Sequence, residues 1–142
     1  MPVYRLFSTV TSEHLLSTDP EEYFQLGFSS WKREGLTFRL LPTNATYNGA
    51  TPTELYRLYN ADIQQHLWTS SALEYAVLPG SGWTQEGVIG YVLPAPQAGT
   101  AALRRLSLAS PPLHLWTISA VEYSALEAAG WTGEGTLGHV FP

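Results

Sequence analysis

Residues 66–94 have the sequence HLWTSSALEYAVLPGSGWTQEGVIGYVLP, and residues 114–142 repeat it as HLWTISAVEYSALEAAGWTGEGTLGHVFP. A third copy, HLLSTDPEEYFQLGFSSWKREGLTFRLLP, occupies residues 14–42. The three copies align from histidine to proline without insertion or deletion, at offsets of 52 and 48 residues. Similarity at fixed offsets is the signature of a repeat architecture, and these matches are too numerous to arise by chance.

The similarity extends further towards the N-terminus, because the same offsets relate Arg5, Arg57 and Arg105. The sequence therefore predicts one domain over residues 1–142, made of three repeats at about 3–42, 55–94 and 103–142. The length differences fall in two connectors, 43–53 and 95–102, which are rich in Ala, Thr, Gly and Pro and are expected to be loops.

Each repeat predicts the order β-β-α-β. Alternating segments such as Val3–Phe7 and Leu55–Tyr59 indicate a first strand, and His66–Thr69 or His114–Thr117 a second. Helix-start signals follow at Asp19-Pro20, at Ser70 or Ser71, and at Ser119, where Glu122 completes a capping-box pattern. The helix is expected to end near Gly130. A last strand is expected after the Glu-Gly pair, at Val88–Leu93 and Thr136–Phe141.

A unit of roughly 40 residues does not bury its own apolar face, so neighbouring repeats must share a core. Three repeats with short connectors favour a closed pseudo-threefold arrangement over an open solenoid. The expected fold class is thus β-rich α+β, in a trefoil-like or propeller-like single domain; periodicity does not choose between these topologies.

The repeated pattern resembles a tandem-repeat family curated as a domain of unknown function. The residues that carry this resemblance are His66, Trp83, Glu86, Gly87, Pro94, His114, Gly130, Trp131, Glu134, Gly135 and Pro142. The first repeat departs from it, with Leu16 at the aromatic position and Ser30 in place of Gly130. The family occurs as a C-terminal appendage of secreted bacterial hydrolases and as stand-alone fungal proteins, which implies a wall- or glycan-directed binding role.

Composition excludes several functions. The net charge is −5 with only seven Lys and Arg, so no basic surface is available for nucleic acid or an anionic membrane. There is no cysteine, and no segment is long and apolar enough to insert into a membrane. No signal peptide is recognised, so the expected location is the cytoplasm, or the exterior after export by another route. Asn44-Ala45-Thr46 matches a glycosylation sequon but is expected to be an ordinary loop.

The repeated charged and aromatic residues each have a structural interpretation. Trp31, Trp83 and Trp131 are expected to fill the core. The glutamates Glu34, Glu86 and Glu134 precede a glycine and are expected to bind backbone at a turn. The arginines are expected to pair with those glutamates or with Glu22, Glu74 and Glu122.

The sequence leaves open the role of the three histidines and the reason for two replacements between repeats that exchange large and small side chains. His14, His66 and His114 are interpreted as structural hydrogen-bonding groups, ligand contacts or a zinc site. Trp68 and Trp116 replace Leu16, whereas Gly90 and Gly138 replace Phe38. One interpretation is compensation within a core of constant density. The other is a shelf, with an indole face above a glycine floor, on which a sugar ring stacks.

These patterns predict a lectin-like carbohydrate-binding protein with two or three equivalent sites, because repetition suits multivalent binding better than a single asymmetric catalytic centre. The alternative is a structural or protein-interaction module. No enzyme activity, cofactor or resident metal is expected, and the expected partners are glycans or glycoconjugates. The candidate ligand-binding residues are His66, Trp68, Tyr91, Glu86, His114, Trp116, His139, Glu134 and His14.

Overall fold

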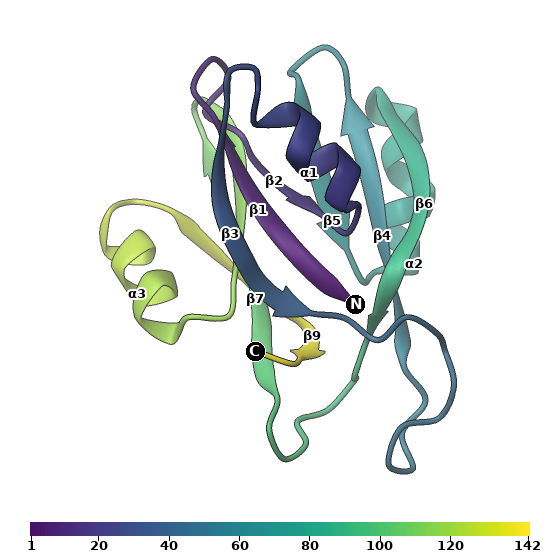
Figure 1. The fold of residues 1–142 in the computed structure, drawn as a ribbon. Coiled ribbons are helices and arrows are strands. Elements are labelled where there is room, and N and C mark those ends of the chain that lie inside the picture. Colours follow the sequence, from purple (N-terminus) through teal and green to yellow (C-terminus); the bar gives the residue numbers. More distant parts are fainter.

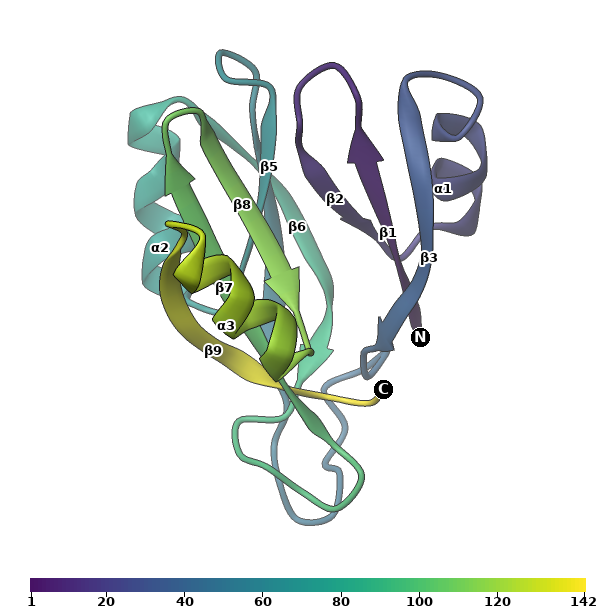
Figure 2. The same ribbon diagram turned by 90° about the vertical axis from the view of Figure 1, so that its left-hand side faces the viewer.

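A computed structural model describes all 142 residues as three small antiparallel sheets and three short helices (Figures 1 and 2). The first sheet contains β1 (Pro2–Ser8), β2 (His14–Ser17) and β3 (Trp31–Arg39), the second β4 (Thr53–Asn60), β5 (Gln65–Thr69) and β6 (Trp83–Val92), and the third β7 (Ala101–Ala109), β8 (Pro112–Thr117) and β9 (Thr132–Val140). In each sheet the first strand of the repeat lies between the second and the third.

One helix lies between the second and third strands of each repeat: α1 (Pro20–Leu26), α2 (Ala72–Val77) and α3 (Ala120–Ala128). A short 3₁₀ helix, Leu78–Ser81, extends α2. The predicted order β-β-α-β is therefore confirmed in all three repeats. None of these helices has the length and apolar character needed to cross a bilayer.

The helix starts follow from side-chain capping. Asp19, Ser71 and Ser119 each accept a hydrogen bond from a backbone N–H of the first turn, which satisfies a donor that the helix leaves free. The predicted capping box at Ser119 forms only in this direction. The Glu122 carboxylate is held by Arg5, and the Ser119 N–H donates instead to Thr117 Oγ1 (3.0 Å).

The end of α3 is a glycine cap. Gly130 has a φ of 102°, its N–H donates to Glu127, and the Trp131 N–H donates to Leu126. This pair of bonds is the Schellman pattern, which needs the left-handed conformation that glycine adopts without strain.

The third strands begin earlier than expected, and the Glu-Gly pair lies inside them. β6 starts at Trp83 and β9 at Thr132, so the prediction of a turn at Glu-Gly is wrong. The register shifts there by one residue: Arg5 pairs with Gly35, while Leu6 pairs with Arg33. Glu34 is therefore the extra residue of a β-bulge, a local irregularity that redirects a side chain.

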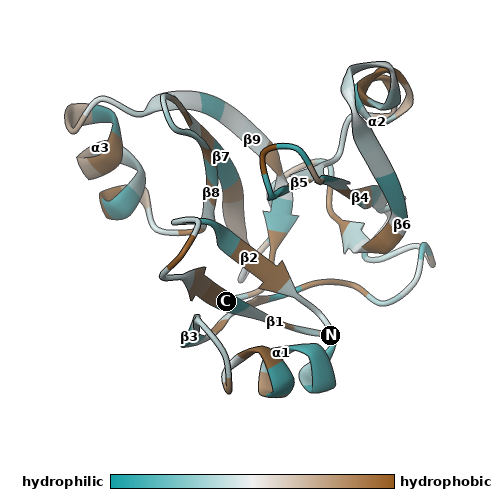
Figure 3. Cartoon of the chain, turned by 90° about the horizontal axis from the view of Figure 1, so that it is seen from above, coloured by the Kyte–Doolittle hydropathy of each residue, from teal (hydrophilic) through white to brown (hydrophobic).

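The core is shared by all three repeats. Its twelve buried members are Val3, Leu16, Phe38, Leu40, Leu55, Leu58, Leu67, Trp68, Val92, Leu103, Trp116 and Val140. Figure 3 shows the three sheet-and-helix units placed around a common middle, with each helix on the outside. Burial in one shared cluster is what a repeat too small to enclose its own core requires.

Backbone bridges connect the ends of the third strands of different repeats. Arg39 pairs with Phe141, Leu41 with Tyr91, and Leu93 with His139, each through two hydrogen bonds of 2.7–3.1 Å. The three bridges join repeat 1 to repeat 3, repeat 2 to repeat 1, and repeat 3 to repeat 2. Each repeat therefore contacts both others through these bridges, which are called the rim bridges below.

Candidate functional site at the repeat junctions

Trp68 and Trp116 lie in the core. Their exposed fractions are 0% and 1%, and the Trp116 Nε1–H donates to the Trp68 carbonyl at 3.2 Å. The interpretation of these indoles as a stacking shelf is therefore wrong. The indoles are not exposed because the strands that carry them, β5 and β8, are themselves mostly buried. Both side chains therefore fill the shared core, as the interpretation of compensating core packing predicts.

The glycine floor is absent for a related reason. A side chain at Gly90 would meet Leu40 and Met1, and one at Gly138 would meet Val92. These neighbours come from the preceding repeat, so the space beside each glycine is filled rather than open. Trp31, Trp83 and Trp131, expected in the core, are only half-buried.

The repeated arginines join the repeats in cyclic order. Each arginine pairs with the bulge glutamate of its own sheet and with the first-turn glutamate of a helix in another repeat. Arg5 of repeat 1 binds Glu122 of repeat 3, Arg57 of repeat 2 binds Glu22 of repeat 1, and Arg105 of repeat 3 binds Glu74 of repeat 2. The sequence left the bulge glutamate and the helix glutamate as alternative partners of each arginine, and the structure shows that each arginine binds both. The bulge glutamates contact arginine rather than the turn backbone expected for them.

The junction of Arg105 is the most densely bonded. Its guanidinium donates to both oxygens of Glu74 (2.7 and 3.0 Å), to Glu134 Oε2 (2.7 Å) and to the buried carbonyl of Trp68 (3.1 Å). Only 10% of the Arg105 side chain is exposed, against 19% for Arg5 and 17% for Arg57. Paired, planar bonding of this kind is the strongest form of arginine–carboxylate contact.

The three histidines lie beside the bulge glutamates. The Nε2 atoms of His14, His66 and His114 are 3.9, 3.8 and 3.5 Å from Glu34, Glu86 and Glu134. Each histidine therefore belongs to a different junction cluster of one arginine, two glutamates and one histidine. The three do not meet, and no group of three or more His, Asp or Glu side chains is placed to hold a metal ion. The common zinc site considered for them is not formed.

Burial and ion pairing act in opposite directions on the pKa values of this network. Burial lowers the pKa of His14 and His114, against the opposing effect of the neighbouring glutamates. Burial works to raise the pKa of Glu74 and Glu122, but hydrogen bonds from Arg105 or Arg5 and from Thr69 or Thr117 outweigh it, and the net pKa of both is lowered. Burial works to lower the pKa of Arg5 and Arg105, but the same glutamates raise it. These directions favour charged Arg5–Glu122 and Arg105–Glu74 pairs near neutral pH.

Acid is expected to destabilise the protein in two stages. The unfolded histidines bind protons below about pH 6.5, while folded His14 and His114 resist protonation, so stability falls first there. The contribution of Glu74 and Glu122 is present above the unfolded pKa, about 4.5, and is lost as pH falls through their lower folded values. Thermal melts across this range measure both stages. The double variant His14→Gln/His114→Gln should lose the first stage and keep the second.

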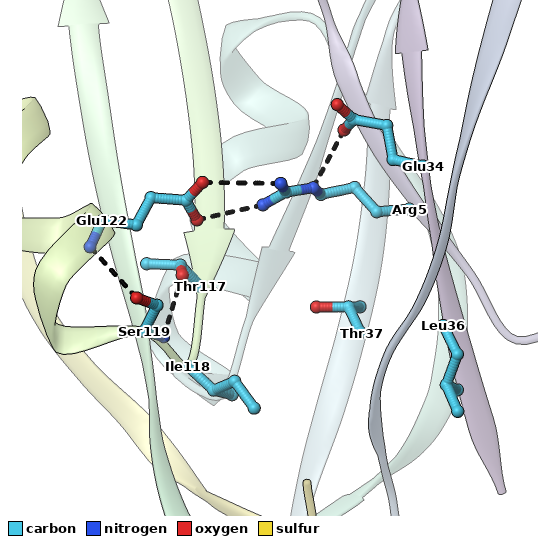
Figure 4. Close-up of a pocket in the computed structure, with 8 residues that line it drawn as sticks. All are labelled: Arg5, Glu34, Leu36, Thr37, Thr117, Ile118, Ser119 and Glu122. Carbon is cyan, nitrogen blue, oxygen red and sulfur yellow. Dashed lines mark hydrogen bonds and ion pairs between the residues drawn. The ribbon is translucent and has the colours of Figure 1, made fainter.

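Two of the junctions carry a surface cavity beside the cluster. The first, of about 310 Å³, lies between repeats 1 and 3, and Figure 4 shows its lining: Arg5, Glu34, Leu36, Thr37, Thr117, Ile118, Ser119 and Glu122. The second, of about 160 Å³, lies between repeats 3 and 2 and is lined by the equivalent residues Arg105, Glu134, Thr136, Leu137, Thr69, Ser70, Ser71 and Glu74. Both combine fixed charges with hydroxyl groups and an aliphatic side.

These two junction cavities contain one predicted site residue, Glu134, directly. Glu86 lies at the third junction, and the histidines lie 3.5–3.9 Å from the bulge glutamates without lining either cavity. Tyr91 and His139 are elsewhere, half-buried in the rim bridges. Sequence reasoning missed the hydroxyl groups of Thr117 and Ser119 and the apolar Leu36 and Ile118 as lining residues. These residues are brought together by the ion pair between the arginine of one repeat and the helix glutamate of another, so that pairing is the sequence signal that could have identified them.

The fold and its junctions define a β-rich module of three similar sheet-and-helix units. The chain belongs to the family described as a domain of unknown function, DUF5648, whose model matches residues 2–141. No curated protein and no solved structure shows significant similarity to the chain.

Proposed function

We propose that the protein is a lectin-like carbohydrate-binding module with equivalent ligand sites at the junctions between repeats. The observation that carries this proposal is the presence, at two junctions, of a polar cavity lined from equivalent positions of the repeats. Ligand contacts come from these cavities and not from Trp68 and Trp116. Binding rather than catalysis is favoured because arginine holds the same glutamates at every junction, and no group has a distinct role.

We infer that the repeats close on themselves with pseudo-threefold symmetry. Both the ion pairs and the rim bridges follow one cyclic order, in which each repeat bonds the one before it and repeat 1 bonds repeat 3. An open array would leave the Arg5 partner missing at one end. Cyclic closure supports the proposal of equivalent sites, because symmetry generates the same junction more than once.

The chemistry of the cavities suits a sugar. Hydroxyl groups both donate and accept, and the lining offers guanidinium donors, carboxylate acceptors and the hydroxyl groups of Thr37 and Thr117. Leu36 and Ile118 provide an apolar side for the C–H face of a ring. The first cavity, of about 310 Å³, is at the lower end of ordinary ligand pockets and suits one sugar unit; the second, of about 160 Å³, has about half that volume.

Two sites on one chain would allow multivalent binding. Weak identical sites gain avidity on a surface that repeats its glycans, and two are enough to cross-link. The motif's resemblance to an appendage of secreted hydrolases supports a target of this kind.

Filling the cavities tests the proposal. Leu36→Trp and Thr136→Trp place a large ring at equivalent exposed positions of the two cavities, and the double variant is expected to lose glycan binding at least tenfold. A glycan array identifies the ligand, and calorimetry then measures the variants. Val88→Trp is the matched control, because it is the equivalent exposed residue at the junction without such a cavity. Absence of any glycan ligand, or equal binding by the double variant, contradicts the proposal.

A protein-interaction role is the second candidate, and one observation favours it. Leu73 and Val121, equivalent residues at the start of α2 and α3, are 73% and 81% exposed. A protein partner that contacts both helices would cover these two apolar side chains. If a protein partner is captured, loss of its binding on Leu73→Ser/Val121→Ser, with the cavity variants unaffected, would favour this role over glycan recognition.

A further inference from the structure

A third cavity, of about 310 Å³, lies between repeats 1 and 2 and does not follow the repeat pattern. It is formed by the β1–β2 and β4–β5 connections together with the start of β3. Its lining includes Glu13, Ser30, Trp31, Tyr59, Gln64 and His66, and no lysine or arginine. None of the junction arginines or bulge glutamates described above lines it.

Glu13 is the central feature of this cavity. Its side chain is 3% exposed, and its Oε2 atom accepts from the main-chain N–H of His66 and contacts His66 Nδ1 at 2.9 Å. The other oxygen, Oε1, has no hydrogen-bond partner in the protein, and it keeps some contact with solvent. The carboxylate therefore offers one unused acceptor from an otherwise buried position.

The fold itself does not require a charge here. Gln65 and Leu113 occupy the equivalent positions of the other two repeats, and both are buried. Burying a carboxylate without full pairing is costly, so a scaffold role is better served by either of the neutral residues. Tyr59 likewise stands where the other repeats have Phe7 and Ser107. The combination of carboxylate, indole and phenol occurs at this junction alone.

We propose that this cavity binds a small organic ammonium ion, with Glu13 Oε1 as its counter-charge and Trp31 and Tyr59 as aromatic walls. A desolvated carboxylate with a free oxygen is best satisfied by a charged N–H donor. Aromatic faces attract the same cation through their quadrupoles. The absence of lysine and arginine from the lining, and a chain charge of −5, disfavour an anionic ligand.

His66 orients the carboxylate. It lies between two acids, with Nδ1 at Glu13 and Nε2 3.8 Å from Glu86, and its ring packs against Tyr59 with centroids 4.6 Å apart. Glu86 is in turn held by Arg57 at 2.9 Å. Glu13 is thus fixed through Oε2 by a group that is itself anchored in a junction cluster, which leaves Oε1 available to the ligand.

Three sugars of related shape test this inference: glucosamine, glucose and N-acetylglucosamine, in phosphate buffer that contains no competing amine. NMR of the indole N–H signals reports binding, and Trp31→Phe assigns the signal of interest. Glucosamine is expected to bind at least tenfold more tightly than the two neutral sugars, because only it carries an ammonium group. Glu13→Gln is expected to abolish that preference.

Glu13→Gln reproduces the Gln65 of repeat 2, so the fold is expected to survive; Tyr59→Ser, which reproduces Ser107, is the second variant. Glu127→Gln, an exposed acid on α3, is the matched control and should change nothing. An equal effect of all three sugars on the Trp31 signal, or a glucosamine effect on that signal that persists in Glu13→Gln, overturns the inference. The inference stands apart from the proposed function, since Leu36→Trp/Thr136→Trp should leave glucosamine binding intact.

Discussion

Trp116→Ala is expected to lower the free energy of unfolding by about 3–5 kcal/mol, the range for removing a large aromatic ring from a packed core. The side chain is 1% exposed and belongs to the cluster shared by all three repeats. Its loss leaves a cavity that several strands border, and it also removes the donor to the Trp68 carbonyl (3.2 Å). Urea unfolding followed by far-ultraviolet circular dichroism measures the change.

Trp131→Ala is the control for the Trp116 experiment. Trp131 is repeated in the same way but only half-buried, so its removal should cost clearly less than that of Trp116. Iodide quenching of fluorescence provides an independent check, because the buried indoles of Trp68 and Trp116 should resist the quencher. A small effect of Trp116→Ala, equal to that of Trp131→Ala, would contradict the placement of Trp116 in the shared core.

Arg105→Leu is expected to cost about 3 kcal/mol or more. Removing one partner of a buried ion pair leaves the other charges without compensation, and such changes commonly cost about 3–5 kcal/mol. Here the removal leaves Glu74 and Glu134 without their arginine, whereas the Trp68 carbonyl keeps its bond from Trp116 Nε1–H. The partial exposure of the two glutamates, 30% and 24%, places the expected value at the lower end.

Arg57→Leu is the matched comparison for Arg105→Leu. Arg57 occupies the equivalent position but makes one bond to Glu22 and one to Glu86, and it is more exposed. Its loss should therefore cost less. A double-mutant cycle of Arg105→Leu with Glu74→Gln measures their coupling directly. If both arginine variants cost under 1 kcal/mol, the junction clusters do not hold the repeats together.

The sequence was sufficient for the repeats and their elements, because these are local or periodic properties. The match of His14, His66 and His114 at fixed offsets defined the units, and capping residues such as Ser119 placed the helix starts within a residue or two. Alternation in Leu55–Tyr59 correctly indicated a strand. Glycine at position 130 correctly indicated where α3 ends.

The errors concern strand pairing and packing between segments distant in the sequence, which no local pattern encodes. Whether Trp68 faces solvent or core depends on how the sheets pack together, and the same sequence suits both. The Glu34-Gly35 pair has the composition of a turn, and only strand pairing on both sides turns it into a bulge. Glu13 carries no signal in the repeat pattern, because Gln65 and Leu113 occupy its equivalent positions.

The bond between Arg5 and Glu122 joins residues 117 positions apart and has a consequence for how the chain reaches its native state. During synthesis the junction of repeat 1 with repeat 3 can form only after repeat 3 has been made. A nascent chain that ends after repeat 2 therefore exposes surface of repeat 1 that is buried in the native protein. Because each repeat is bonded to both others, unfolding should be a single all-or-none event and should not proceed repeat by repeat.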